Sequence, residues 1–233
     1  MYIILFKMDE NEFRKDEAFI NQNSQHIQTK DIPKIQKCIC KFHQYDQKDE
    51  KQIIGTGFFL KFPFGKKDMR VLLTSYHVLD INNKDYINYT NEENEKELHI
   101  SNREIIKSDS NNLDYICIPL FEHDNIENFL DIDKNIFNPG YNLKDKQIQI
   151  YKYDLTLSLG KIINIKDKKE IFYDCNTEAG WSGGPILTKD NKVIGIHKGT
   201  DNKEKLNYGI FIKNIIDDIK KQIQKLKDEN KKM

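Results

Sequence analysis

The sequence Gly180-Trp181-Ser182-Gly183-Gly184-Pro185 places one serine among glycines, in a turn that must bend sharply. Because glycine has no Cβ, its backbone takes conformations that other residues avoid. Such a bend exposes the serine hydroxyl and turns neighbouring backbone N–H groups toward one point. A nucleophile in acyl transfer needs a reachable oxygen and donors for the oxyanion that forms. A glycine-rich surface turn is the alternative, so the interpretation depends on a base and an orienting carboxylate elsewhere in the chain.

A candidate base lies upstream, directly after a predicted buried strand. Val71-Leu72-Leu73-Thr74 runs into Ser75-Tyr76-His77-Val78. A histidine here can act as a general base because its neutral form is populated near pH 7. A purely structural histidine is the alternative for His77, and the sequence favours the structural interpretation for His26, His43, His99 and His123.

A candidate orienting acid begins the apolar segment Leu113-Asp114-Tyr115-Ile116-Cys117-Ile118. A carboxylate that enters a buried strand costs free energy unless it is hydrogen-bonded. A histidine N–H would satisfy Asp114, and the carboxylate would in turn fix the tautomer of the ring. A strand-edge acid that faces water is the alternative, and Asp109 in the polar segment 108–112 is the rival carboxylate.

Four motifs in this order resemble the trypsin-like serine peptidases, which have the chymotrypsin fold. They are Gly55-Thr56-Gly57-Phe58, then Leu72-Leu73-Thr74-Ser75-Tyr76-His77-Val78, then Leu113-Asp114-Tyr115-Ile116, then Gly180–Pro185. The resemblance extends over roughly residues 35–212. It implies an all-β fold of two packed antiparallel six-stranded β-barrels, a catalytic cleft between them and a closing C-terminal helix. It also implies a protein or peptide substrate, and neither a cofactor nor a metal.

The resemblance assigns roles by position. His77 matches the general base, Asp114 its orienting acid and Ser182 the nucleophile, while the backbone N–H groups of Gly180 and Ser182 match the oxyanion hole. Zymogen-type relatives carry an aspartate directly before the serine, to pair with a freshly cut N-terminus. Trp181 stands there instead and cannot form that ion pair, so activation by N-terminal cleavage is not expected. A loop that a partner or a substrate must reshape stays open as an alternative.

The residues around the serine also resemble the glutamyl endopeptidase branch of the family. Thr177, His197 and Thr200 match the positions at which hydroxyls and a histidine hold a substrate carboxylate. Hydroxyls and an imidazole are suitable donors for an acid. The resemblance therefore implies a preference for Glu before the cut. A histidine that merely fills the barrel is the alternative for His197, and Glu178 would repel an acidic side chain if it pointed inward.

Two further features bear on substrate binding. Asn176 offers no charge near the base of the predicted specificity site, which disfavours a preference for Lys or Arg. Lys198, Gly199 and Thr200 are predicted to pair as an edge strand with the substrate backbone.

The pattern outside these motifs favours strands over helices until the C-terminus. Ile35, Cys38, Cys40 and Phe42 approximate the alternation of a half-buried strand, whereas residues 82–97 are polar and loop-like. Isoleucines at helical spacing predict one amphipathic helix at about residues 213–230. We expect an N-terminal extension over residues 1–33 and a single peptidase domain over residues 34–233.

Composition narrows the class of partner and the compartment. The 37 basic and 37 acidic residues balance, which argues against nucleic acid or an anionic membrane as the main partner. The apolar start at residues 1–6 lacks the features of a signal peptide, so a cytoplasmic location is expected. The four cysteines, Cys38, Cys40, Cys117 and Cys175, lie in apolar segments and are expected to be buried free thiols.

Two functions follow from the sequence. The first is a serine endopeptidase that works through an acyl-enzyme. The second is a weak or inactive pseudo-peptidase, in which the same cleft binds a peptide or protein without cutting it. A cytoplasmic peptidase must avoid random damage, so a narrow substrate range or a regulatory partner protein is expected in the first case.

Overall fold

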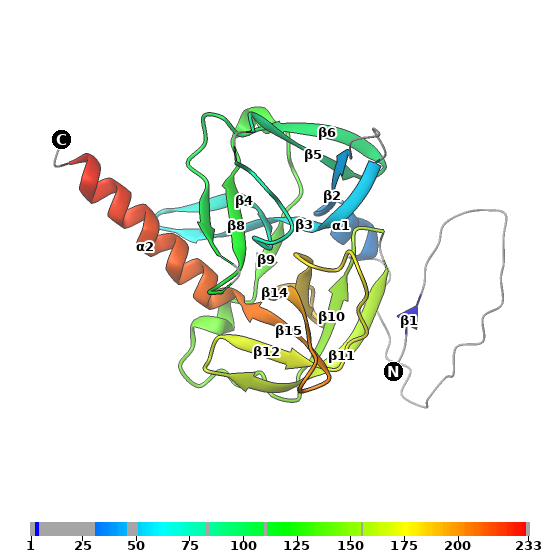
Figure 1. Cartoon of the computed structure of the whole chain (residues 1–233). Coiled ribbons are helices and arrows are strands. Elements are labelled where there is room, and N and C mark those ends of the chain that lie inside the picture. The colour runs from blue at the N-terminus through cyan, green and yellow to red at the C-terminus, as the bar shows by residue number, and fades with distance from the viewer. Residues whose placement is uncertain are drawn as a thin grey trace.

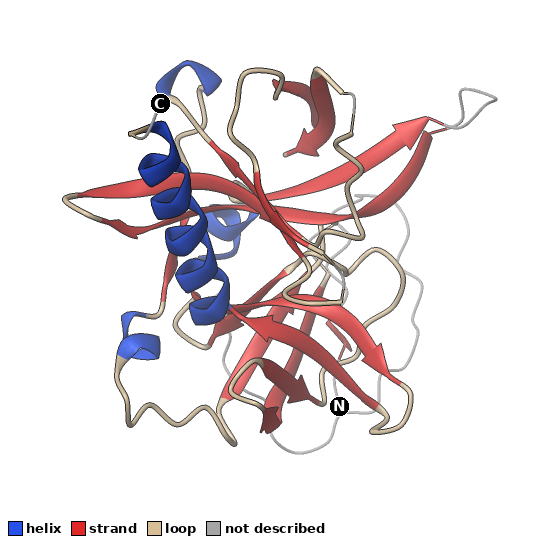
Figure 2. Cartoon of the chain, turned by 60° about the vertical axis from the view of Figure 1, so that its left-hand side comes forward, coloured by secondary structure: helices blue, strands red, loops and turns tan. Residues whose placement is uncertain are grey.

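The structure of the protein is a computed structural model (Figures 1 and 2). It describes residues 3–4, 31–45, 51–82, 84–109, 111–154 and 156–231, with the side chains of 3–4, 44–45 and 51–54 left aside. Most of the expected N-terminal extension therefore lies outside the described residues. In the described part of the chain, no helix is long and apolar enough to cross a bilayer.

The first half of the described chain forms an antiparallel sheet that curls around its own core. The strand order is β6-β5-β2-β3-β4-β8-β7. The bounds are β2 Ile39–Tyr45, β3 Lys51–Phe64, β4 Lys67–Thr74, β5 Tyr86–Asn91, β6 Asn94–His99, β7 Ile106–Ser108 and β8 Tyr115–Pro119.

The second half closes into a six-stranded antiparallel barrel. Its order is β13-β10-β11-β12-β15-β14, and β14 pairs back with β13. The bounds are β10 Gln147–Tyr151, β11 Leu157–Lys166, β12 Glu170–Tyr173, β13 Pro185–Thr188, β14 Lys192–Asp201 and β15 Leu206–Phe211. These results confirm the expected all-β fold.

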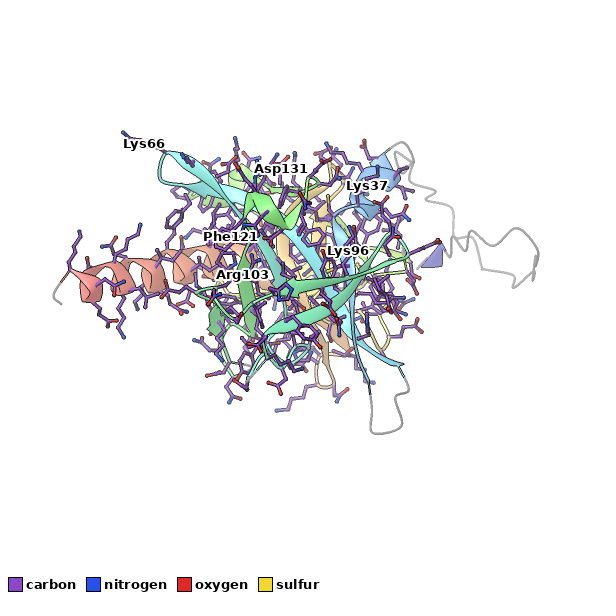
Figure 3. The ribbon with its side chains drawn as sticks, turned by 90° about the horizontal axis from the view of Figure 1, so that it is seen from above. Lys37, Lys66, Lys96, Arg103, Phe121 and Asp131 are labelled. Carbon is purple, nitrogen blue, oxygen red and sulfur yellow. The ribbon has the colours of Figure 1, made fainter. Side chains whose placement is uncertain are left out.

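Short elements connect and flank the two halves. β9 pairs in parallel with both β3 and β14, and thus bridges the halves. β1 pairs with β11. The bounds are β1 Ile3–Ile4, α1 Ile32–Gln36, η2 Glu122–Asp124, β9 Leu130–Ile132 and η3 Lys134–Phe137. Near η2, Nη1 and Nη2 of Arg103 donate to the two carboxylate oxygens of Asp124, and the guanidinium lies over the Phe121 ring (Figure 3).

Two stretches differ from the sequence prediction. Ile35 lies in α1 and not in a strand, because Pro33 occupies the first turn of a helix, where its missing N–H costs nothing. The strand begins only at Ile39. Residues 82–97 are not a loop, because the hairpin β5–β6 covers residues 86–99. The turn residues of this hairpin, Glu92 and Glu93, both have positive φ. Most side chains of β6 face water, so this strand has too few apolar residues to show the alternation that predicts a strand.

The C-terminal helix α2 spans Ile212–Asn230, as the isoleucine spacing predicted. Ile212, Ile215, Ile216 and Ile219 are buried in the larger of the two core clusters. The C-terminal end of α2 extends beyond the body of the molecule (Figures 1 and 3). The helix therefore docks through its first half.

All four cysteines are free and buried, which agrees with the prediction. Burial raises the pKa of the Cys38 thiol to about 12. Thiols in this state are not ionised at neutral pH and act as small apolar groups.

Candidate active site

The serine loop makes a tight turn in which the position after Ser182 accepts only glycine. The turn closes where the N–H of Gly184 donates to the carbonyl of Trp181 at 2.9 Å. Gly183 has φ +82°, and a Cβ placed on it would lie 2.2 Å from the carbonyl oxygen of Thr56. Both the conformation and the space thus exclude a side chain at Gly183. Ser182 is thereby held against a strand of the other half of the molecule.

The structure brings the predicted base and its acid together. Nδ1 of His77 lies 2.8 Å from Oδ2 of Asp114, and the backbone N–H of His77 donates to Oδ1 at 3.2 Å. The side chain of Asp114 is fully buried, whereas that of His77 is 38% exposed. Asp114 has φ +48° just before β8, a conformation that aspartate tolerates better than most residues. The two hydrogen bonds offset the cost of burying this carboxylate.

Ser182 and Val78, the residue after His77, meet at one glycine. A Cβ on Gly55 would lie 2.6 Å from Cγ1 of Val78, the neighbour of His77, and 3.0 Å from the carbonyl oxygen of Ser182. The Ser182 hydroxyl donates to the carbonyl of Lys198 at 3.3 Å. Among the described residues, no hydrogen bond joins Ser182 to His77. The serine is thus in the neighbourhood of the base, with its hydroxyl turned to a different acceptor.

The turn before the serine presents the N–H groups of Gly180 and Ser182 without an acceptor among the described residues. The N–H of Trp181 donates to the carbonyl of Glu178 at 3.4 Å, and Gly180 has φ +90° while Ala179 has a negative φ. This combination defines a type II turn. Within the part of the chain that the structure describes, neither the Gly180 N–H nor the Ser182 N–H donates to another residue.

Trp181 does not crowd this turn from outside. Its side chain is 2% exposed and belongs to the larger hydrophobic core. The indole therefore packs into the hydrophobic core and does not project into solvent beside the loop.

His197 is buried and neutral. The hydroxyl of Tyr173 pairs with its Nδ1 at 2.5 Å. Burial, together with the nearby His77, lowers the pKa of His197 to about 3. Its Nε2 makes no hydrogen bond to a described residue. If Tyr173 donates to Nδ1, the neutral ring presents an N–H at Nε2 and carries no positive charge.

Thr177, Thr200 and Glu178, which the sequence places near the specificity site, differ in exposure and in hydrogen bonding. Thr177 is half-buried, and its hydroxyl has no partner among the described residues. Thr200 is exposed, and its hydroxyl donates to Oδ1 of Asn207 at 2.6 Å. Glu178 does not point inward: its side chain is 72% exposed and its carboxylate lies 3.3 Å from Nζ of Lys152.

Gly199 and Thr200 have one strand edge that pairs with no described strand. Their other edge pairs with Tyr208 and Asn207 of β15. A Cβ on Gly199 would meet nothing within 4 Å, so this segment borders open space. An extended peptide could add here as a further strand.

A family model of the trypsin-like peptidase domain matches residues 55–196, more than half of the chain. The chain belongs to this family. The fold is also similar to that of three solved structures, at identities that support the fold alone. The serine protease domain of the Sesbania mosaic virus polyprotein shares 20% identity at a TM-score of 0.54, over 76% of this chain and 88% of that one.

The other two structures are bacterial. A serine endoprotease from Yersinia pestis shares 15% identity at a TM-score of 0.61, over 87% of this chain and 68% of that one. The active form of a protease from M. tuberculosis shares 11% identity at a TM-score of 0.59, over 87% of this chain and 93% of that one.

Sequence reasoning missed three residues of this trypsin-like peptidase domain. Thr56 donates to the serine loop, Tyr173 orients His197, and Lys152 pairs with Glu178. The sequence offered a signal for Thr56 alone. This threonine lies between two glycines of a strand, and glycine in a strand marks the close approach of another chain segment. In the described residues, no group of three His, Cys, Asp or Glu could hold a metal ion.

Proposed function

We propose that this trypsin-like peptidase is a serine endopeptidase that hydrolyses peptide bonds through an acyl-enzyme. The observation that carries the proposal is the buried Asp114 carboxylate on Nδ1 of His77, close to a serine held in a glycine turn. Because Nδ1 faces the carboxylate, this nitrogen carries the proton and Nε2 remains the acceptor. That is the tautomer a general base needs.

In the proposed reaction, Ser182 Oγ attacks the scissile carbonyl while His77 Nε2 takes its proton. The oxyanion is stabilised by the N–H groups of Gly180 and Ser182, which have no acceptor of their own among the described residues. His77 then gives the proton to the leaving amine, which leaves the acyl-enzyme. Water attacks the acyl-enzyme in the same way, with His77 as the base, and releases the acid product and free Ser182. The Ser182 hydroxyl must first rotate away from the Lys198 carbonyl, a single χ1 change.

Covalent labelling with a fluorophosphonate tests this proposal. We expect the wild-type protein to be labelled on Ser182, and Ser182→Ala to abolish both the labelling and the turnover of casein. Labelling that persists in Ser182→Ala would indicate a different nucleophile. Binding of peptides without labelling or turnover would instead support the pseudo-peptidase.

We further propose that the peptidase prefers Glu before the cut. The support is the Thr177 hydroxyl without a described partner and the pairing of Glu178 with Lys152 outside the site. In this proposal Tyr173 donates to Nδ1 of His197, so that the ring offers a donor at Nε2. Because His197 is neutral, the site would recognise the acid by hydrogen bonds and not by an ion pair.

A peptide library tests the preference. Cleavage after Glu, lost in Ser182→Ala and weakened in Thr177→Val, is the expected result. Cleavage after Lys or Arg with none after Glu would contradict the preference while leaving the peptidase activity in place.

A further inference from the structure

Thr56 contacts the serine loop through its side chain and its backbone. It lies in β3 of the first half and is completely buried. Its hydroxyl donates to the carbonyl of Gly180 at 2.7 Å, and its N–H donates to the carbonyl of Ser182 at 2.9 Å. One residue of the first half thus touches the loop both before and at the serine.

The first of these bonds holds the Gly180–Trp181 peptide at its oxygen. The same peptide is held at its nitrogen, because the Trp181 N–H donates to the Glu178 carbonyl. The plane of this peptide is therefore restrained at both ends.

The second bond does the same for the Ser182–Gly183 peptide. Its carbonyl accepts from the Thr56 N–H, and its N–H donates to the carbonyl of His197 at 2.9 Å. The peptide that carries the Ser182 N–H lies between these two and is held as well, because the Trp181 carbonyl accepts from the Gly184 N–H at 2.9 Å. The Ala179–Gly180 peptide, which carries the Gly180 N–H, precedes them and makes no hydrogen bond to a described residue. The directions of the Gly180 and Ser182 N–H groups therefore depend on the restrained peptide planes beside them.

Gly180 most needs this restraint from outside. With no Cβ, glycine rotates at little cost between conformations, and a rotation here would turn its N–H away from the oxyanion. The Thr56 hydroxyl holds the peptide plane that follows Gly180, which limits the combinations of φ and ψ that Gly180 can take. Thr56 is itself anchored, because the hydroxyl of Thr74 donates to its carbonyl oxygen at 2.8 Å.

We propose that the Thr56 hydroxyl is a positioning group for the oxyanion hole. It does not touch the substrate; it holds the Gly180–Trp181 peptide so that the Gly180 N–H faces the developing oxyanion. This inference rests on the proposed peptidase function. Among the described residues, the Thr56 hydroxyl bonds only to the Gly180 carbonyl. A substitution can therefore remove this hydrogen bond without changing the backbone of the strand.

Thr56→Val tests the proposal, because valine keeps the shape and removes the hydroxyl. We expect kcat to fall about 10- to 100-fold, since small misplacement of catalytic groups has effects of this size. KM should stay within about twofold, because the lost stabilisation belongs to the transition state. The affinity for a peptide aldehyde, whose adduct places an oxygen in the oxyanion hole, should fall with kcat. Thr56→Ser should restore both.

Two further comparisons separate positioning from stability. Thr90→Val removes a buried hydroxyl with no described hydrogen-bond partner and should leave kcat unchanged. All rates are divided by the active-site concentration, titrated with a fluorophosphonate, so that unfolded molecules do not count. If Thr56→Val does not fold, Thr56→Ser and Thr56→Ala form a second pair that differs by the hydroxyl alone.

The outcomes are distinct. Wild-type kcat in Thr56→Val, or a change confined to KM, overturns the positioning role while the peptidase function stands. A folded wild-type protein with neither labelling nor turnover overturns the peptidase function, and the positioning role falls with it.

Discussion

The carboxylate of Asp114 holds His77 at two points, one on the ring and one on the backbone. Oδ2 meets Nδ1 at 2.8 Å, and Oδ1 accepts from the backbone N–H at 3.2 Å. A ring held by one bond could pivot about it, but the second bond fixes the backbone of the turn after β4 that carries the ring. Asp114 thus sets both the tautomer and the position of the proposed base.

Asp114→Asn is expected to lower kcat by about 10³- to 10⁴-fold, because an amide can donate to Nδ1 and so favour the wrong tautomer. The fold should persist, since asparagine tolerates the positive φ of this position. Steady-state kinetics and thermal unfolding measure the two effects. Asp109→Asn is the matched control: Asp109 is exposed and binds only local backbone, so kcat should not change. A similar loss in both variants would contradict the assignment of Asp114.

Gly183→Ala is expected to lower the free energy of unfolding by about 2–4 kcal/mol, from the positive φ together with overpacking. The Cβ would lie 2.2 Å from the Thr56 carbonyl oxygen and 2.3 Å from the Thr74 hydroxyl. Urea unfolding of Gly183→Ala against Gly140→Ala measures the effect, because a Cβ on Gly140 meets nothing within 4 Å. Equal stabilities of the two variants would show that the loop does not pack against Thr56 as described.

Acid should destabilise the protein through His197. Burial lowers the folded-state pKa of His197 to about 3, from an ordinary value of 6.5, so between these values the unfolded state binds a proton that the folded state does not. Stability contributed by neutral His197 is therefore present above pH 6.5 and is lost as the pH falls toward 3. His197→Gln should lose about 2–3 kcal/mol less than the wild type between pH 7 and pH 4.5. Identical losses in urea unfolding would mean that His197 is not held neutral.

The docking of α2 should contribute directly to stability. Ile216→Ala removes a fully buried side chain and is expected to cost about 2–5 kcal/mol in the free energy of unfolding. Lys221→Ala, at an exposed position of the same helix, should change it by less than about 0.5 kcal/mol. Chemical denaturation of both variants measures the difference. An Ile216→Ala variant as stable as Lys221→Ala would indicate that the helix does not pack on the barrel.

Some secondary structure could be predicted from local pattern, and some could not. The isoleucines of α2 recur at helical spacing because one face of the helix is buried, so its bounds were predicted closely. The hairpin β5–β6 escaped prediction because most side chains of β6 are exposed. Its pairing is decided by backbone hydrogen bonds and by the turn at Glu92 and Glu93, which an alternation of apolar residues does not reveal.

By itself, the sequence predicted the family, the all-β class and the proposed roles of Ser182, His77 and Asp114. Each of these lies in a short motif whose chemistry is local: a glycine turn, a strand end, an acid that enters an apolar strand. Only the tertiary structure decided that Thr56 grips the turn 124 residues away, that Tyr173 pairs with a neutral His197, and that Glu178 turns outward to Lys152. A hydrogen bond between segments far apart in the chain depends on how the two halves pack, and no single segment carries that information.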